Sequence, residues 1–144
     1  MTADELARAA AQAMWDADTA SRGLGMSLDH VALGTATLTM DVTEAMTNGH
    51  KTCHGGFIFA LADSAFACAC NSRNQRAVAQ MCQITYIAPA HLGDRLIATC
   101  RELSFRGRSG LYDTRVTNQH GTLIAEFRGH SRTIQGTHVP PPQE

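Results

Sequence analysis

The feature that most constrains the fold is a segment that is apolar on every side when drawn as a helix. It runs from Gly55 to Asn71, and Asp63 is its only charged residue. A helix without a polar face has to be covered on all sides by the rest of the chain. A carboxylate is rarely buried unless it has a partner or a chemical task. The chain is therefore expected to fold around this helix, with Asp63 as the first candidate functional group.

Strands are predicted on both sides of this helix in the sequence. Apolar and polar residues alternate from Ala36 to Val42, and a preceding strand over Leu28–Leu33 is expected to pair with this one across Gly34. Glycine-containing turns separate the later strand-like runs and favour antiparallel connections. These runs are Ala77–Ile87, Arg95–Phe105, Leu111–Asn118 and Thr122–Ile134.

The N-terminus is predicted to be helical. Thr2 and Glu5 match a capping box and are followed by apolar residues at helical spacing. We expect this single helix to end near Gly23 or Gly25.

About six antiparallel strands and one wholly apolar helix have few sensible packings. A sheet that curls around the helix covers it best. The sequence therefore predicts an α+β hot-dog fold, with a six-stranded antiparallel sheet wrapped around a long central apolar helix, plus an N-terminal helix. Residues 1–136 are expected to form this single domain, and residues 137–144 an exposed proline-rich tail.

Composition narrows the classes of partner. The chain has 144 residues and a formal net charge of −1, which gives no reason to expect binding to nucleic acid or to acidic membranes. No apolar run reaches the roughly 18 residues that suggest a membrane span. The N-terminus is acidic where a secretory signal would be basic, so a cytoplasmic location is expected.

Metal and cysteine chemistry are not expected either. The five cysteines form no CxxC pair, and the seven histidines show no metal-ligand spacing. Cys53 stands beside His54, but sequence neighbours seldom form a nucleophile–base pair. We predict reduced cysteines, no metal and no cofactor.

Asp63 allows two interpretations. Its helical neighbours are apolar: Phe59, Ala60, Phe66 and Ala67. Burial of this kind should raise the carboxyl pKa above its ordinary value of about 3.9. The carboxylate could be a general base that activates water or a nucleophile. Alternatively, it could be a structural group bonded to a backbone amide or an arginine.

Gly55 and Gly56 leave the start of this helix without side chains. A ligand carbonyl could approach the free N–H groups of the first turn there and be polarised by them and by the helix dipole. The alternative is a plain helix start, where glycine tolerates unusual dihedral angles.

The spacing of these groups has a consequence for assembly. Gly55 and Asp63 are eight residues apart, which is about 12 Å along a helix axis. One reacting carbonyl needs both groups within about 3 Å of its atoms. If both serve one carbonyl, Gly55 of one subunit must meet Asp63 of another, with two equivalent sites per symmetric pair.

An ordered set of motifs then resembles the hot-dog acyl-CoA thioesterases of phenylacetate degradation, over nearly the whole chain. The motifs are Asn48-Gly49-His50, His54-Gly55-Gly56, Leu61-Ala62-Asp63, Ala69-Cys70-Asn71-Ser72, Tyr112-Asp113, Val116-Thr117-Asn118 and Phe127-Arg128-Gly129. The resemblance implies hydrolysis of an acyl-CoA, with phenylacetyl-CoA or hydroxyphenylacetyl-CoA as substrate. It also implies a catalytic carboxylate at Asp63, a carbonyl-binding amide at Gly55, and homodimers or tetramers built from dimers.

Two further residues are candidates for the catalytic site. The Asn48 amide could position water or the thioester, as a polar residue does at this place in similar enzymes, or could simply form the turn with Gly49. His54 could cap the helix, orient the loop, bond the substrate carbonyl or act as an acid. Some related thioesterases hold the water with Thr or Ser one turn after the carboxylate. Here that position is Ala67, and Ser64 is the nearest hydroxyl.

Substrate-binding candidates complete the prediction. Gly56, Ser64 and Phe66 are expected near the acyl group, although Phe66 could equally be core. Arginines can bind phosphates through two hydrogen bonds. A turn that contains Arg106, Arg108 and Ser109 is therefore expected to bind coenzyme A, or else to be a solvated hairpin tip.

Two other functions remain open. A hot-dog hydratase or dehydratase would need a histidine–carboxylate pair, but the His54-Gly55-Gly56 loop lacks the proline of the His-x-Pro-Gly type. An acyl-CoA-binding regulator would need an output module, and only a single helix is predicted before the fold.

Overall fold

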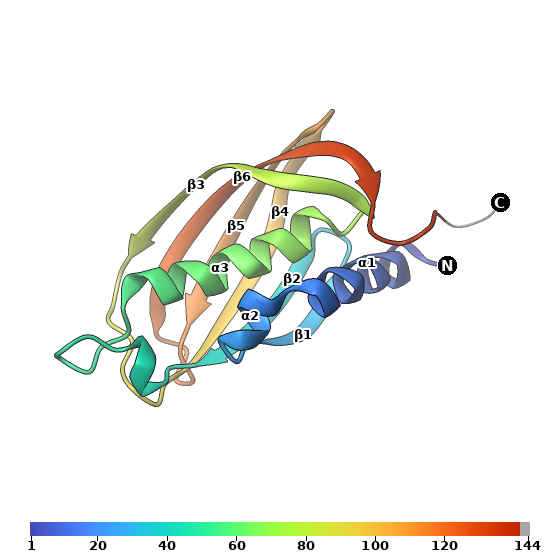
Figure 1. Ribbon diagram of the computed structural model, residues 1–144. Helices are drawn as coiled ribbons and strands as arrows, with labels where there is room; N and C mark the ends of the chain where they lie inside the picture. The colour runs from blue at the N-terminus through green and yellow to red at the C-terminus, as the bar shows by residue number, and fades with distance from the viewer. Residues whose placement is uncertain (142–144) are drawn as a thin grey trace.

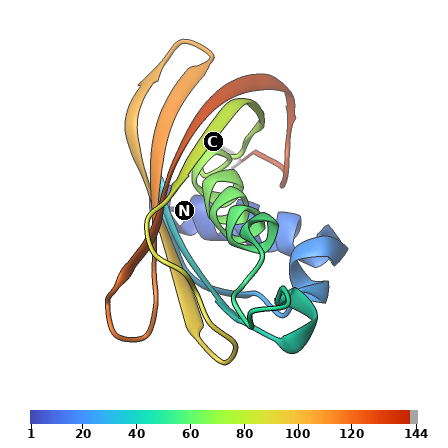
Figure 2. The same ribbon diagram turned by 90° about the vertical axis from the view of Figure 1, so that its left-hand side faces the viewer.

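The computed structural model describes residues 1–141, and they form one curled sheet around one helix (Figures 1 and 2). The strands are β1 (Ser27–Ala32), β2 (Thr35–Asp41), β3 (Gln75–Tyr86), β4 (Arg95–Arg106), β5 (Ser109–Thr117) and β6 (Leu123–Thr137). The helices are α1 (Ala3–Ala17), α2 (Thr19–Gly23) and α3 (Gly55–Cys70), with a short 3₁₀ helix η1 (Glu44–Met46).

The six strands are antiparallel in the order β1-β2-β4-β5-β6-β3. Helix α3 lies against the concave face of this sheet, and α1 and α2 lie on the same side, near β1 (Figures 1 and 2). The prediction of a hot-dog fold with a central apolar helix is confirmed. The connection through Gly93-Asp94 is not a hairpin, because β3 pairs with β6 at the edge of the sheet.

The core forms where α3 meets the inner face of the sheet. Leu61, Ala62 and Ala65 are completely buried. Gly129 of β6 lets the helix come close, since a Cβ atom there would lie 2.7 Å from the Phe66 ring. Burial of one leucine side chain such as that of Leu61 stabilises a fold by about 1.5–3 kcal/mol.

The N-terminal helix differs from its prediction. The capping box of Thr2 and Glu5 is confirmed, but the helix ends at Ala17 and a separate α2 follows. Asp18 causes the break, because its side chain accepts a hydrogen bond from the Ser21 N–H and so caps a new helix.

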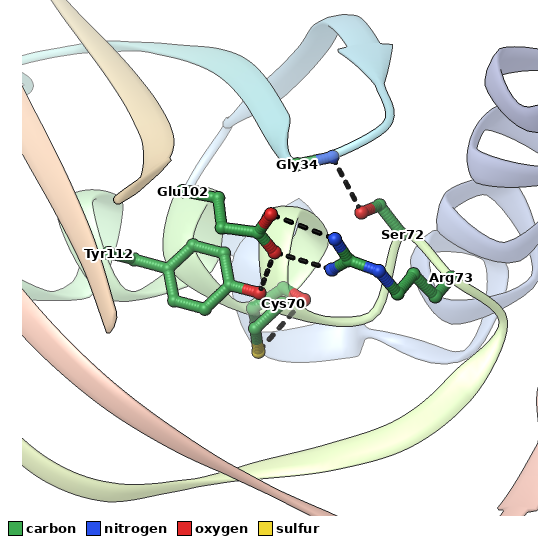
Figure 3. A network of polar contacts seen from close by, with 7 residues as sticks. Gly34, Cys70, Ser72, Arg73, Glu102 and Tyr112 are labelled. Carbon is green, nitrogen blue, oxygen red and sulfur yellow. Dashed lines mark hydrogen bonds and ion pairs between the residues drawn. The ribbon is translucent and has the colours of Figure 1, made fainter. Parts of the chain in front are cut away.

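Polar side chains fix the C-terminal end of α3 to the sheet (Figure 3). Glu102 of β4 forms a two-pronged ion pair with Arg73 and accepts a hydrogen bond from the Tyr112 hydroxyl at 2.7 Å. The Arg73 hydrogen bonds hold the pKa of the Glu102 carboxyl below its usual value. The Ser72 hydroxyl oxygen accepts a hydrogen bond from the Gly34 N–H at 2.8 Å. The helix end is thus bound to both β4 and β5 and to the turn before β2.

The end of β6 also contacts this region. The Asn74 side chain accepts hydrogen bonds from the N–H groups of His138 and Val139, both half-buried. Thr137 is the last residue of β6, Pro140 and Pro141 are exposed, and the rest of the predicted tail, 142–144, lies outside the described residues.

The Glu102 network predicts unequal losses of stability. Tyr112→Phe removes one hydrogen bond and should lower the free energy of unfolding by about 1 kcal/mol. Glu102→Ala leaves the buried Tyr112 hydroxyl and the Arg73 guanidinium without their acceptor, and should cost about 3 kcal/mol. Urea unfolding measures both values. Equal losses for the two variants would contradict this account of the network.

Candidate active site

The first turn of α3 leaves the Gly55 backbone donor free. His54 is the N-cap, and its Nδ1 atom accepts a hydrogen bond from the Gly56 N–H at 3.3 Å. The Phe57 N–H donates to the His54 carbonyl at 3.0 Å. Within residues 1–141, the Gly55 N–H has no hydrogen-bond partner. Gly55, rather than Gly56, therefore presents its amide to a ligand.

Asn48 builds the loop that precedes this turn. Its Oδ1 atom accepts hydrogen bonds from the His50 N–H at 2.9 Å, from the Thr52 hydroxyl at 3.0 Å and from the Thr52 N–H at 3.3 Å. The side-chain carbonyl thus has a structural role, as the turn interpretation predicted. The exposed amide nitrogen has no partner in the part of the chain that the structure describes.

Asp63 lies in the middle of α3 and is half-buried. Burial raises the pKa of its carboxyl group. Burial and, after it, the negative charge of Asp63 also raise the pKa of Cys82 on β3. No hydrogen bond or ion pair among residues 1–141 involves the Asp63 side chain. The bond to a backbone amide or an arginine, which the structural interpretation of Asp63 would require, is therefore not found among these residues.

A mostly apolar hollow of about 480 Å³ opens beside Gly55, between the start of α3 and the segment that follows β3. This size is typical of a small-molecule site. It is lined by Thr52, Cys53, Gly55, Ile58, Tyr86, Ile87, Ala88, Pro89 and Ala90.

A second hollow of about 530 Å³ involves Asp113 and Arg115 of β5. These residues alternate with the buried Tyr112 and Thr114, so this hollow lies on the outer face of the sheet, away from α3.

Tyr86 is a residue of this site that the sequence did not reveal. It ends β3, and its hydroxyl donates a hydrogen bond to the Gly55 carbonyl at 2.8 Å. The contact joins residues 31 positions apart, and only the placement of β3 along α3 creates it. The strand pattern before Pro89 was the available signal, but it does not indicate which side chain reaches the helix.

Two predicted substrate-binding side chains point elsewhere. The Ser64 hydroxyl lies 2.8 Å from the Ser21 hydroxyl, which donates to the Asp18 carboxylate at 2.6 Å. Phe66 is buried in the core and packs edge-on against Tyr112. Neither side chain lines the hollow beside Gly55, because Ser64 faces α2 and Phe66 faces the sheet.

The side chains predicted to bind phosphates lie on the exposed turn between β4 and β5; they are Arg106, Arg108 and Ser109. This turn is bonded to Thr133 of β6, which is paired with Ala77 at the start of β3. Gly55 contacts Tyr86 at the other end of β3. Nine residues of strand correspond to about 30 Å, so one chain does not bring the arginines to the hollow.

Cys53 and His54 do not form a nucleophile–base pair. The Cys53 thiol donates to the His54 backbone carbonyl at 3.5 Å, and the His54 Nδ1 atom is bonded to Gly56. Burial raises the pKa of the Cys53 thiol to about 11, so the reactive thiolate is scarce at neutral pH.

These features describe a site for carbonyl chemistry with an acidic partner, and comparison with known proteins agrees. A family model described as Thioesterase superfamily matches residues 50–125, more than half of the chain. The chain belongs to the thioesterase superfamily. The predictions of a hot-dog fold and of a thioesterase are thus confirmed.

Individual relatives of this thioesterase extend the comparison. The acyl-coenzyme A thioesterase PaaI of Escherichia coli is 43% identical over 127 residues, which cover 88% of this chain and 91% of the relative. A solved structure of E. coli PaaI covers 94% of this chain and 99% of its own, with 41% identity and a TM-score of 0.93. A Streptococcus mutans protein solved with bound acetyl-CoA is 25% identical, with a TM-score of 0.74, over 78% of this chain and 90% of its own.

The described residues offer neither a metal site nor a membrane-spanning helix. Residues 1–141 contain no cluster of three or more His, Cys, Asp or Glu side chains suited to a metal ion. Within the same residues, every helix is too short or too polar to cross a bilayer.

Asp63 gives a prediction with two readouts. Asp63→Asn should lower kcat at least about a hundredfold, because neither a base nor a nucleophile remains. The folded state holds the Asp63 proton more tightly than the unfolded chain does, so ionisation of Asp63 opposes folding at neutral pH. The melting temperature of Asp63→Asn at pH 7 should therefore not fall below that of the wild type.

The wild-type pH profile tests the same group. A base or nucleophile at Asp63 would have to be ionised, so the rate should fall on the acid side through a pKa above the ordinary 3.8. For the Asp63→Asn variant described above, a kcat close to that of the wild type would show that Asp63 is neither the base nor the nucleophile.

Proposed function

We propose that the chain hydrolyses acyl-CoA thioesters at a site formed by two copies of the chain. One observation carries the proposal: within residues 1–141, α3 holds a Gly55 N–H without a partner at its start and a half-buried Asp63 carboxylate without a partner two turns later. The name of the E. coli relative and the acetyl-CoA bound to the S. mutans protein support an acyl-CoA as the substrate.

The need for two copies follows from the helix. Gly55 and Asp63 belong to one continuous α3, so about 12 Å of helix separates them. A thioester carbonyl bound at Gly55 cannot reach Asp63 of the same chain. An antiparallel pairing of two copies would bring the start of one α3 toward the middle of the other.

Strand β3 is the edge best suited to this pairing. It is 12 residues long and forms one edge of the sheet, whereas β1 at the other edge has six residues and packs against α1. Long exposed apolar edges are templates for pairing with another strand. Large apolar side chains are about half exposed on β3 and just after it: Val78, Met81, Tyr86 and Ile87.

The chemistry then follows from the two groups. The Gly55 N–H of one copy and the positive end of its helix dipole bind the thioester carbonyl. Asp63 of the other copy takes a proton from water, whose oxygen attacks the carbonyl carbon. The C–S bond breaks, and the thiolate of coenzyme A takes up the proton from Asp63. Alternatively, Asp63 attacks the carbonyl carbon first, and the C–S bond breaks with coenzyme A leaving as the thiolate. Water then hydrolyses the mixed anhydride, which returns the Asp63 carboxylate, releases the acid and supplies the proton for the thiolate. Both routes use the same residues.

Within the described residues, no histidine is bonded to Asp63, although the hydratase alternative would need such a pair.

The acyl group of the substrate is a separate part of the proposal. Phenylacetyl-CoA and hydroxyphenylacetyl-CoA are the proposed substrates, in line with the phenylacetic acid degradation operon named for the E. coli structure.

A substrate panel tests the function. With purified protein, phenylacetyl-CoA and hydroxyphenylacetyl-CoA should release free thiol with a kcat/KM about tenfold above that of acetyl-CoA, because the hollow beside Gly55 is mostly apolar. Hydration of crotonyl-CoA without thiol release would indicate a hydratase. Binding of all these esters without turnover would indicate a regulator.

Mixed dimers test the shared site. Gly55→Pro removes the free N–H, and proline is tolerated at the first helical position after the extended His54. Its Cβ would meet the Tyr86 ring, so this chain also carries Tyr86→Ala. Exchange with Asp63→Ala chains should restore about a quarter of wild-type activity, since half of the dimers are hybrids with one intact site each.

The controls for the mixing experiment are the two unmixed variants, which should both be inactive. Hybrids that form, as shown by differently tagged chains, but stay inactive would contradict a site shared between subunits.

A further inference from the structure

Tyr86 makes an unusual contact with the first turn of α3. Its hydroxyl donates to the Gly55 carbonyl at 2.8 Å, although the side chain is about half exposed. Within residues 1–141, this is the only side-chain hydrogen bond from the sheet to the turn formed by residues 55–58. The end of the edge strand is thereby joined to the residue that carries the free N–H.

The Tyr86 ring also explains why residue 55 is glycine. A Cβ atom on Gly55 would lie 2.9 Å from Cζ and 3.0 Å from the hydroxyl oxygen of Tyr86. The backbone of Gly55 is helical and is not among the residues with positive φ, so an unusual dihedral angle is not the reason. With Tyr86 in this position, there is no room for a Cβ atom at residue 55.

These two contacts constrain Gly55 in different directions. The ring limits sideways movement of the Cα atom, and the hydroxyl limits rotation of the carbonyl. A donor that stabilises developing charge works best when it is already oriented, and an error of about 1 Å in such a position costs a large part of the rate.

We infer that Tyr86 is a positioning residue, which holds Gly55 so that its N–H points at the thioester carbonyl. This inference rests on the proposed function, in which that N–H binds the carbonyl. Tyr86 acts through Gly55 and takes no part in proton transfer.

The chain contains only one other tyrosine, Tyr112, and it provides a matched control. Tyr86→Phe keeps the ring and removes the hydrogen bond to Gly55. Its kcat should fall about tenfold, with KM within about twofold of wild type. The reason is that a poorly oriented Gly55 N–H stabilises the transition state less but changes substrate binding little. Its melting temperature should stay near wild type. Tyr112→Phe should do the opposite, with a lower melting temperature and an unchanged kcat.

A double-mutant cycle tests the steric part. Gly55→Ala should lower kcat about a hundredfold, because its Cβ displaces the tyrosine or the helix. In a Tyr86→Ala background the same change should cost less than about threefold, because the clash is gone. An equal cost in both backgrounds would mean that Gly55 is needed for ligand approach, and would overturn the steric argument.

A readout without substrate separates this inference from the proposed function. In ¹H–¹⁵N spectra, Tyr86→Phe should shift the Gly55 and Gly56 amide resonances, whereas Tyr112→Phe should leave them in place. Absence of thioester hydrolysis by the wild type would refute the proposed function. Unshifted amides in Tyr86→Phe, or a kcat equal to wild type in an active enzyme, would overturn the role of Tyr86.

Discussion

The enclosure of α3 by the sheet is the constraint on which the rest of the structure depends. A helix that is apolar on every side is unstable in water, so the strands curl until their inner face covers it. Phe66 fits against Gly129 because no Cβ separates the two elements. Close packing of this kind fixes the helix along the sheet and therefore fixes where its first turn and its single carboxylate lie.

The same helix accommodates two features that are unfavourable for folding. The Gly55 amide and the half-buried Asp63 carboxylate have no partner among the described residues, and each carries a cost in free energy. The fold tolerates them because many apolar contacts along α3 outweigh them. Their persistence on a helix that is otherwise optimised for burial is what connects the architecture to acyl transfer.

Much of this arrangement could be predicted from the sequence because it depends on local patterns. The period of two in β2, the capping box at Thr2 and the apolar run of α3 each identify an element without knowledge of its neighbours. The break at Asp18 was missed because aspartate can end one helix while capping the next, and the apolar spacing continues across it. A local pattern cannot distinguish these cases.

The site was harder to predict because it depends on contacts between distant residues. Ser64 was expected near the substrate because it follows Asp63 in the sequence. Successive helical residues point about 100° apart, however, and Ser64 faces Ser21 of α2. Tyr86 was missed because nothing in its own strand indicates that it reaches Gly55. The sequence identified the helix and its chemical groups, and the tertiary packing decided which of them face the hollow.

The two ends of α3 are held very differently. At the C-terminal end, Arg73, Glu102 and Tyr112 form a charged network (Figure 3). The Asn71 side chain is also bonded to the backbone of Ala77. At the other end, His54 caps the helix and its N–H donates to the Met46 carbonyl at 2.8 Å, and the Tyr86 hydroxyl donates to the Gly55 carbonyl. One end of α3 is thus held by charged groups and the other by neutral ones. Dissolved salt screens charged groups, so the orientation of the first turn should be insensitive to ionic strength.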